Sequence, residues 1–184
     1  QEEDLAQLVK DIRVREKLHA VILLSHNGMD VDLKLASRVS GIDAILGGHT
    51  HDGVPVPVVV DNGGGKTIVT NAGSNGKFVG VLDLEFGRTG VVGFRYRLLP
   101  VFSNLLDEHV EMAKYISEVR APYLPALNEK LATTESLLYR RGNFNGTFDQ
   151  VICDALLEQL DSQIALSPGF RWGTTVLPGD TITM

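Results

Sequence analysis

The stretch "AVILLSHNGMDVDLKLASRVSGIDAILGGHTHDG" (residues 20–53) decides the fold, because it holds one complete strand–helix–strand unit. The runs "AVILL" and "IDAIL" are short and continuously apolar, which is the pattern of parallel strands buried on both faces. Between them, "MDVDLKLASRVSG" has helical spacing and ends at Gly41, a residue type that favours helix C-termini. We therefore predict two buried parallel strands joined by a helix, within an α/β fold.

The sequence on either side of this unit divides the chain into two predicted domains, 1–102 and 103–184. Glycine turns and β-branched residues alternate from residue 54 to residue 100, which indicates antiparallel strands. A helical pattern follows, and Pro122 and Pro125 are expected to break or kink it. The remaining predicted elements are a helix at 3–18, a strand at 134–140, a helix at 148–161 and a short strand at 163–166.

Histidines follow both strands of the unit. His26 comes two residues after the first, and His49 and His51 follow the second in the pattern Gly-Gly-His-x-His. The carboxyl ends of parallel strands share one edge of a sheet, where ligands bind, so these three side chains are expected to converge. Imidazole is the commonest metal-ligating side chain. The alternative is that each is a turn residue satisfied by a hydrogen bond.

Nearby carboxylates are candidates for completing a metal shell, since a two-metal hydrolytic site needs oxygen ligands as well. The candidates are Asp30, Asp32, Asp43 and Asp52. Asp30 and Asp32 lie at a predicted helix start, however, where capping and the helix dipole are sufficient explanations.

Two further segments raise the question of ligand binding. In "LSPGFRWG" (166–173), Phe170 and Trp172 flank Arg171, whose guanidinium is suited to a bidentate contact with an anionic oxygen group. The alternative is an arginine stacked on an aromatic ring for stability. The segment "VDNGGGKT" (60–67) lacks the first glycine of a phosphate-binding loop, and we interpret it as a hairpin turn.

Composition excludes several classes of function. The net charge is −6 with no basic block, which argues against a nucleic-acid surface. No apolar run approaches the roughly 18 residues of a membrane span. Cys153 is the single cysteine, so an internal disulfide is impossible, and its setting predicts a packed position on the buried side of a helix rather than catalysis.

The motifs "LSHNG" and "GGHTH" together resemble those of the calcineurin-like metallophosphoesterases, and more narrowly the 5′-nucleotidase family. "IALSPGFRWGTTVLPGDTIT" resembles the Gly-Gly-x-Arg turn of that family's C-terminal domain, and "FDQVICDALLEQL" resembles one of its helices. Departures at Asp149-Gln150 and in "PGFRW" are similar to one branch of the family, the SoxB thiosulfohydrolases. The resemblance extends over nearly the whole chain.

The resemblance implies a fold, a cofactor and a substrate. The fold would be the second half of a metallophosphoesterase α/β sandwich followed by the first part of a substrate-binding α/β domain. Two divalent metal ions, with manganese as the predicted metal, would support release of sulfate from a cysteine-S-thiosulfonate on the carrier complex SoxYZ. The setting would be periplasmic, without nucleic-acid or membrane partners.

Site residues follow from the same resemblance. His26, His49 and His51 match metal ligands, and Arg171, with Phe170 and Trp172 beside it, matches a substrate-binding arginine. The bridging aspartate and catalytic histidine are expected before residue 1, so the segment alone is expected to be inactive. The open alternatives are a 5′-nucleotidase-type phosphoesterase and a noncatalytic metal-binding or carrier-docking module.

Overall fold

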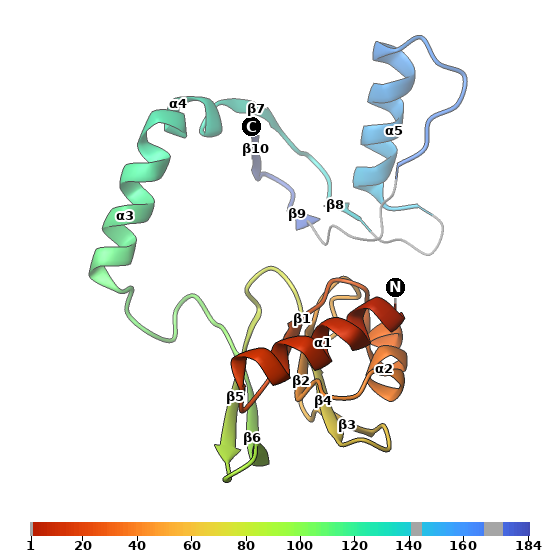
Figure 1. Cartoon of the computed structure of the whole chain (residues 1–184). Helices are drawn as coiled ribbons and strands as arrows, with labels where there is room; N and C mark the ends of the chain where they lie inside the picture. Colours follow the sequence, from red (N-terminus) through yellow and green to blue (C-terminus); the bar gives the residue numbers. More distant parts are fainter. Residues whose placement is uncertain (1, 141–144, 168–174) are drawn as a thin grey trace. The chain divides into compact units, whose positions relative to one another are not determined.

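The computed structural model describes residues 2–140, 145–167 and 175–184. The chain has a mixed α/β fold and forms two compact units, Gln1–Asp107 and Glu108–Met184 (Figure 1). The elements of the first unit are, in order, α1 (Glu2–Glu16), β1 (Ile22–Leu24), α2 (Met29–Arg38), β2 (Ala44–Gly47), β3 (Val58–Asp61), β4 (Lys66–Asn71), β5 (Phe78–Phe86) and β6 (Val91–Pro100).

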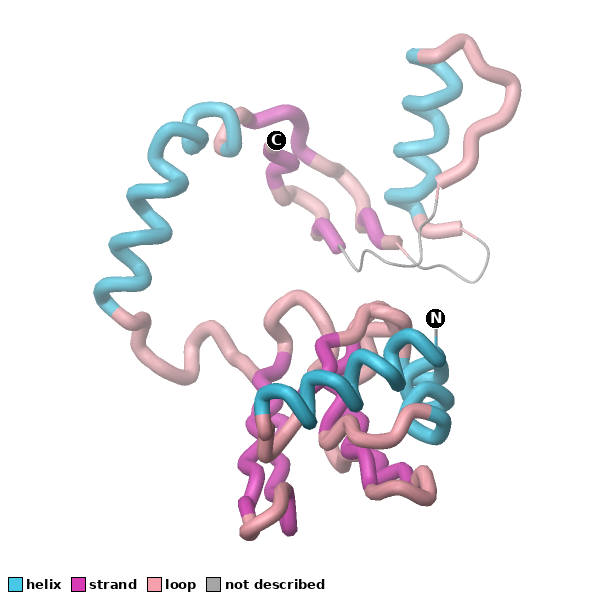
Figure 2. The backbone as a smooth tube through the Cα atoms, viewed as in Figure 1, coloured by secondary structure: helices cyan, strands magenta, loops and turns pink. Residues whose placement is uncertain are grey.

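The first unit is built on a four-stranded sheet in the order β1-β2-β4-β3. Figure 2 draws the strands in magenta. Strands β1, β2 and β4 run parallel, and β3 pairs antiparallel with β4. The β3–β4 turn opens after the pair Asp61–Lys66, which confirms "VDNGGGKT" as a hairpin. Strands β5 and β6 form a separate antiparallel hairpin. The predicted parallel strand–helix–strand unit is thus present.

The hydrophobic core lies between the sheet and the helices α1 and α2. Its buried members come from both helices, from strands β2 and β4, and from the turn after α2. Full burial of an aliphatic side chain contributes about 1.5–3 kcal/mol, so this cluster supplies much of the unit's stability. The members are Val9, Ala36, Val39, Ile42, Ile45 and Val69.

Strand β1 is not buried on both faces, and that prediction is wrong. Leu24 is 78% exposed and Ile22 is 41% exposed. The reason is position, because β1 is an edge strand of the sheet and only β2 pairs with it among the described residues. An apolar run indicates a strand but not its neighbours.

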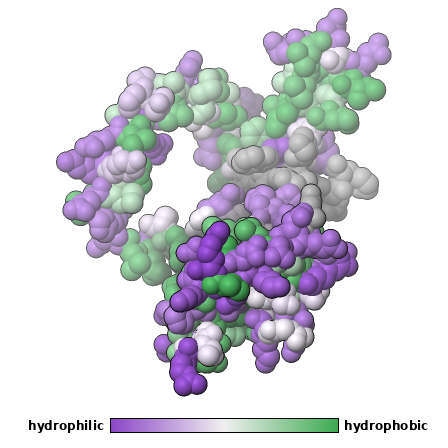
Figure 3. Space-filling view, viewed as in Figure 1, coloured by the Kyte–Doolittle hydropathy of each residue, from purple (hydrophilic) through white to green (hydrophobic). Residues whose placement is uncertain are grey.

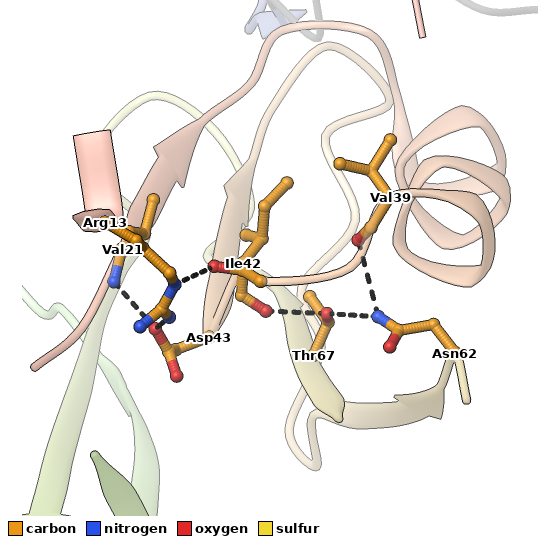
Figure 4. A network of polar contacts seen from close by, with 8 residues as sticks. Arg13, Val21, Val39, Ile42, Asp43, Asn62 and Thr67 are labelled. Atoms are coloured by element: carbon orange, nitrogen blue, oxygen red, sulfur yellow. Dashed lines mark hydrogen bonds and ion pairs between the residues drawn. The ribbon is translucent and has the colours of Figure 1, made fainter. Parts of the chain in front are cut away.

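Polar contacts connect the elements of the first unit at the amino ends of the parallel strands (Figure 4). Arg13 forms an ion pair with Asp43, and its Nε donates to the carbonyl of Gly41 (2.7 Å). The backbone N–H of Val21 also donates to the Asp43 carboxylate (2.7 Å). Deeper in the core, the hydroxyl of Thr67 donates to the carbonyl of Ile42 (2.7 Å). These contacts tie α1, β1 and β2 together.

The second unit contains α3 (Val110–Arg120), η1 (Ala121–Tyr123), α4 (Leu124–Leu127), β7 (Lys130–Thr133), β8 (Leu138–Tyr139), α5 (Thr147–Gln159), β9 (Thr175–Val176) and β10 (Thr181–Thr183). Helix α3 ends just before Pro122, as predicted. The predicted strand at 163–166 is absent, since those residues have no regular structure. Hydrophobic side chains gather on the surface of α5 (Figure 3).

Candidate metal centre

Two histidine turns meet at the carboxyl edge of the sheet. His26 lies two residues after β1, and His49 two residues after β2. The backbone N–H of Ser25 donates to the carbonyl of Leu46 (3.0 Å), which extends the parallel pairing up to the turns. The imidazole rings of His26 and His49 are 5.2 Å apart between centroids, with their planes at 72°. The sequence prediction that these two histidines converge is borne out by this geometry.

Glycines allow the two turns to approach this closely. A Cβ atom at Gly48 would lie 3.1 Å from Nδ1 of His26. A Cβ atom at Gly28 would lie 3.0 Å from Cγ2 of Thr50 and 3.7 Å from Cδ2 of His49. Each turn therefore presents a glycine to the histidine turn opposite, and side chains at these positions would push the imidazoles apart.

The second turn holds its histidines in an unfavourable backbone conformation. His49 has φ of 73° and His51 has φ of 63°. Residues with a side chain adopt this left-handed region at a cost, and such strain gathers at functional sites. Thr50, between them, fixes the turn, because its hydroxyl donates to Asp52 (2.5 Å) and accepts from the N–H of Met29 (3.4 Å). The turn is thereby tied to the start of α2.

The described residues bring together a pair of imidazoles rather than a complete shell. No group of three or more His, Cys, Asp or Glu side chains within them is placed to hold a metal ion. His51 is exposed on the same turn as His49. Among the described residues, no hydrogen bond involves the imidazole ring of His26, His49 or His51. Two adjacent rings with free nitrogens are suitable donors for part of a metal shell.

The carboxylates considered as candidate metal ligands lie in different surroundings. Asp43 lies at the amino end of β2, opposite the histidines, and is engaged by Arg13, so it is not a ligand of this centre. Asp52 accepts from Thr50. Asp32 is fully buried and accepts a hydrogen bond from Ser25. The capping half of the interpretation of Asp30 and Asp32 is wrong, because the N-cap of α2 is Gly28 without a side-chain cap. Both acids do lie in the first turn of α2, where the helix dipole favours a negative charge.

The predicted substrate residues Phe170, Arg171 and Trp172 lie outside the described residues. A polar contact that the sequence did not single out is present just before them. Arg140 forms an ion pair with Asp149 (2.8 Å) and donates to the hydroxyl of Ser167 (3.3 Å). Only the charge of Arg140 was visible in the sequence, and its buried partner depends on the fold.

Comparisons with known proteins show which proteins this chain is similar to. No protein-family model matches it. The structure of the sulfate thiohydrolase SoxB of Thermus thermophilus, in complex with glycerol, matches the whole chain at 38% identity with a TM-score of 0.81. The trifunctional nucleotide phosphoesterase YfkN of Bacillus subtilis is 44% identical over 103 residues, which are 56% of this chain and 7% of that protein. A 5′-nucleotidase precursor from Thermus thermophilus shares the fold over 99% of the chain, with a TM-score of 0.79 at 22% identity.

The chain belongs to the 5′-nucleotidase family of metallophosphoesterases, which are hydrolases. Within that family it is SoxB-like. The chain spans 33% of the SoxB structure and 40% of the 5′-nucleotidase structure. No helix among the described residues is long and apolar enough to cross a membrane.

Proposed function

We propose that the protein containing this chain is a two-metal thiosulfohydrolase that releases sulfate from a cysteine-S-thiosulfonate on a SoxY-type carrier protein. One observation carries the proposal, namely the match to the sulfate thiohydrolase SoxB over 100% of the chain at 38% identity. The convergence of His26 and His49 supports it, since that edge of the sheet is where an α/β hydrolase places its ligands.

The histidines are the metal donors that this chain contributes. His26 and His49 supply adjacent imidazole nitrogens, and His51 supplies a further one from the same turn as His49. When bound, two divalent ions would neutralise charge on the sulfonyl oxygens and polarise them. Manganese is our proposed metal, because hard oxygen-rich sites with some imidazole suit it. Turnover requires ligands beyond these three, since a two-metal site needs several per ion.

Substrate, partner and location follow from the same proposal. Arg171 would pair with the sulfonate oxygens, and Phe170 and Trp172, its neighbours in the sequence, would contact the substrate. The partner would be the SoxYZ complex, whose swinging arm carries the thiosulfonate on a cysteine. The setting would be the periplasm, where this carrier operates.

The test is a two-substrate assay on the intact protein in manganese buffer. One substrate is AMP, and the other is a flexible peptide that carries a cysteine-S-thiosulfonate near its end, in imitation of a carrier arm. We expect release of sulfate with little phosphate, and loss of that activity in His49→Ala. His19→Ala is the matched control and should retain activity, because His19 precedes β1 at the opposite end of the strand. Metal binding without turnover of either substrate would identify a noncatalytic module.

The second candidate is a nucleotide phosphoesterase, favoured by the 44% identity with YfkN over 103 residues. The bulk of Phe170 and Trp172 beside Arg171 argues against a nucleoside pocket. Phosphate release from AMP without sulfate release from the peptide would establish this candidate and overturn the first.

A further inference from the structure

A layer of buried polar side chains lies beneath the histidine turns. Asp32 on α2 is 0% exposed, and Asn71, the last residue of β4, is 2% exposed. Each leaves one side-chain oxygen without a hydrogen-bond partner among the described residues, Oδ2 of Asp32 and Oδ1 of Asn71. Buried polar atoms are rarely left unpaired in native proteins, so these two require an explanation.

The register of the sheet places the two side chains that carry the unpaired oxygens over the same face, at neighbouring strands. Oδ2 of Asp32 is 2.6 Å from the point where a Cβ atom of Gly47 would stand, so it occupies the space that this glycine leaves open. Gly47 pairs in register with Asn71 across the parallel strands β2 and β4. Side chains of register partners point to the same face of a sheet. The amide of Asn71 therefore flanks the carboxylate of Asp32 over Gly47.

Each of the two side chains forms a hydrogen bond to one of the two histidine turns. Oδ1 of Asp32 accepts from the hydroxyl of Ser25 (2.5 Å), and that hydroxyl accepts from the side-chain amide of Asn27 (3.0 Å). Ser25 and Asn27 are the residues on either side of His26. On the other turn, the side-chain amide of Asn71 donates to the carbonyl of Gly48 (3.4 Å), directly before His49.

The two unpaired atoms are both oxygens that accept hydrogen bonds, and this limits which group can bridge them. Both are acceptors, so neither can satisfy the other, and a donor of two hydrogen bonds is required. A water molecule is the simplest such donor, and internal waters commonly bridge buried polar groups in this way. Thr70, whose hydroxyl also lacks a partner in the described part of the chain, lies on the opposite face of β4 and cannot take this role.

We propose that Asp32 and Asn71, bridged by one internal water, are positioning residues that set the spacing of His26 and His49 for metal binding. The proposal rests on the metal-ligand role of these histidines in the proposed function. Groups that orient metal ligands typically change metal affinity by 10- to 100-fold when removed. Here the orientation is transmitted through Ser25 on one side and the Gly48 carbonyl on the other.

The experiment measures Mn²⁺ affinity of the intact protein by calorimetry for the parent and four variants. Asp32→Ala removes the support, and Asp32→Asn keeps its shape while placing a donor toward Asn71. Thr67→Val is the matched control, because Thr67 is also 0% exposed and its hydroxyl bonds to Ile42, at the other end of β4. His49→Ala tests the ligand role itself. Ser25→Ala replaces Asp32→Ala should the latter fail to fold.

We expect Mn²⁺ affinity to fall at least tenfold in Asp32→Ala and to stay near the parent value in Asp32→Asn and Thr67→Val. Parent-like affinity in Asp32→Ala, with loss in His49→Ala, would overturn the positioning role alone. Equal loss in Asp32→Asn would also overturn it, because the carboxylate charge rather than its placement would then matter. Parent-like affinity in His49→Ala would instead refute the metal centre.

A crystal structure at high resolution tests the bridge directly. We expect water density within hydrogen-bonding distance of Oδ2 of Asp32 and Oδ1 of Asn71 in the parent. A dry gap between the two side chains would overturn the water bridge.

Discussion

At the scale of single residues, the backbone conformation of His49 is energetically unfavourable in the metal-free protein. Its φ of 73° lies in the left-handed region, where a side chain is disfavoured by about 1–2 kcal/mol. Such a conformation persists when surrounding contacts enforce it. Here those contacts are the hydrogen bonds of Thr50 to Asp52 and to the start of α2.

Replacing His49 by glycine and by alanine should reveal this strain. Glycine adopts the left-handed region freely, so we expect metal-free His49→Gly to be more stable than His49→Ala by about 1 kcal/mol. Urea unfolding in the presence of a chelator measures the difference. At Ser37, inside helix α2, the order should reverse, because alanine is there favoured over glycine by a similar amount. Equal stability of the two His49 variants would mean that the turn stores no strain.

Predictions about single residues were correct where the succession of residues along the chain was enough to make them. The meeting of His26 and His49 follows from two strands that each end in a histidine turn and run parallel. The burial of Asp32 could not be predicted, because its position at a helix start is equally typical of an exposed cap. Its environment depends on Gly47, which comes close only after the sheet has formed.

At the scale of elements, a buried ion pair contributes to anchoring α5. Asp149 in its first turn pairs with Arg140 after β8, and the two side chains are only 9% and 11% exposed. Removing one member of a buried ion pair typically costs about 3–5 kcal/mol.

Asp149→Ala is therefore expected to destabilise the second unit by several kcal/mol. The matched control is Glu118→Ala on α3 in the same unit, since its pair with Lys114 is exposed (64% and 76%) and worth less than about 1 kcal/mol. Hydrogen exchange of α5 amides measures both. If the two variants lower protection equally, the buried pair has no special role in holding α5.

The helices and strands themselves were easier to predict from sequence than the elements that pack beside them. Helices and strands were recognised where apolar spacing was regular, as in α1, α2 and the β3–β4 hairpin. The exposure of β1 was missed because an apolar run does not reveal which strands flank it. The strand predicted at 163–166 failed for a related reason: Ile164 and Leu166 are 79% and 86% exposed, so no partner buries them in the described chain.

At the scale of the whole molecule, the histidine turns and their buried support belong to one unit, Gln1–Asp107, and the Arg140–Asp149 pair belongs to the other. A ligand stabilises the structure that it binds, by about 2.7 kcal/mol at a concentration 100 times its dissociation constant. Metal binding at His26 and His49 should therefore raise the stability of the first unit.

Saturating Mn²⁺ is expected to slow hydrogen exchange in the intact protein over residues 22–28 and 44–52, and to leave α5 unchanged. The effect should extend to core amides of β4, because Asn71 links that strand to the turn of His49 through Gly48. His49→Ala should abolish the response, whereas Thr67→Val should retain it. Protection that rises equally in α5 would mean that metal binding couples the two units. An unchanged first unit, in turn, would place the metal away from these histidines.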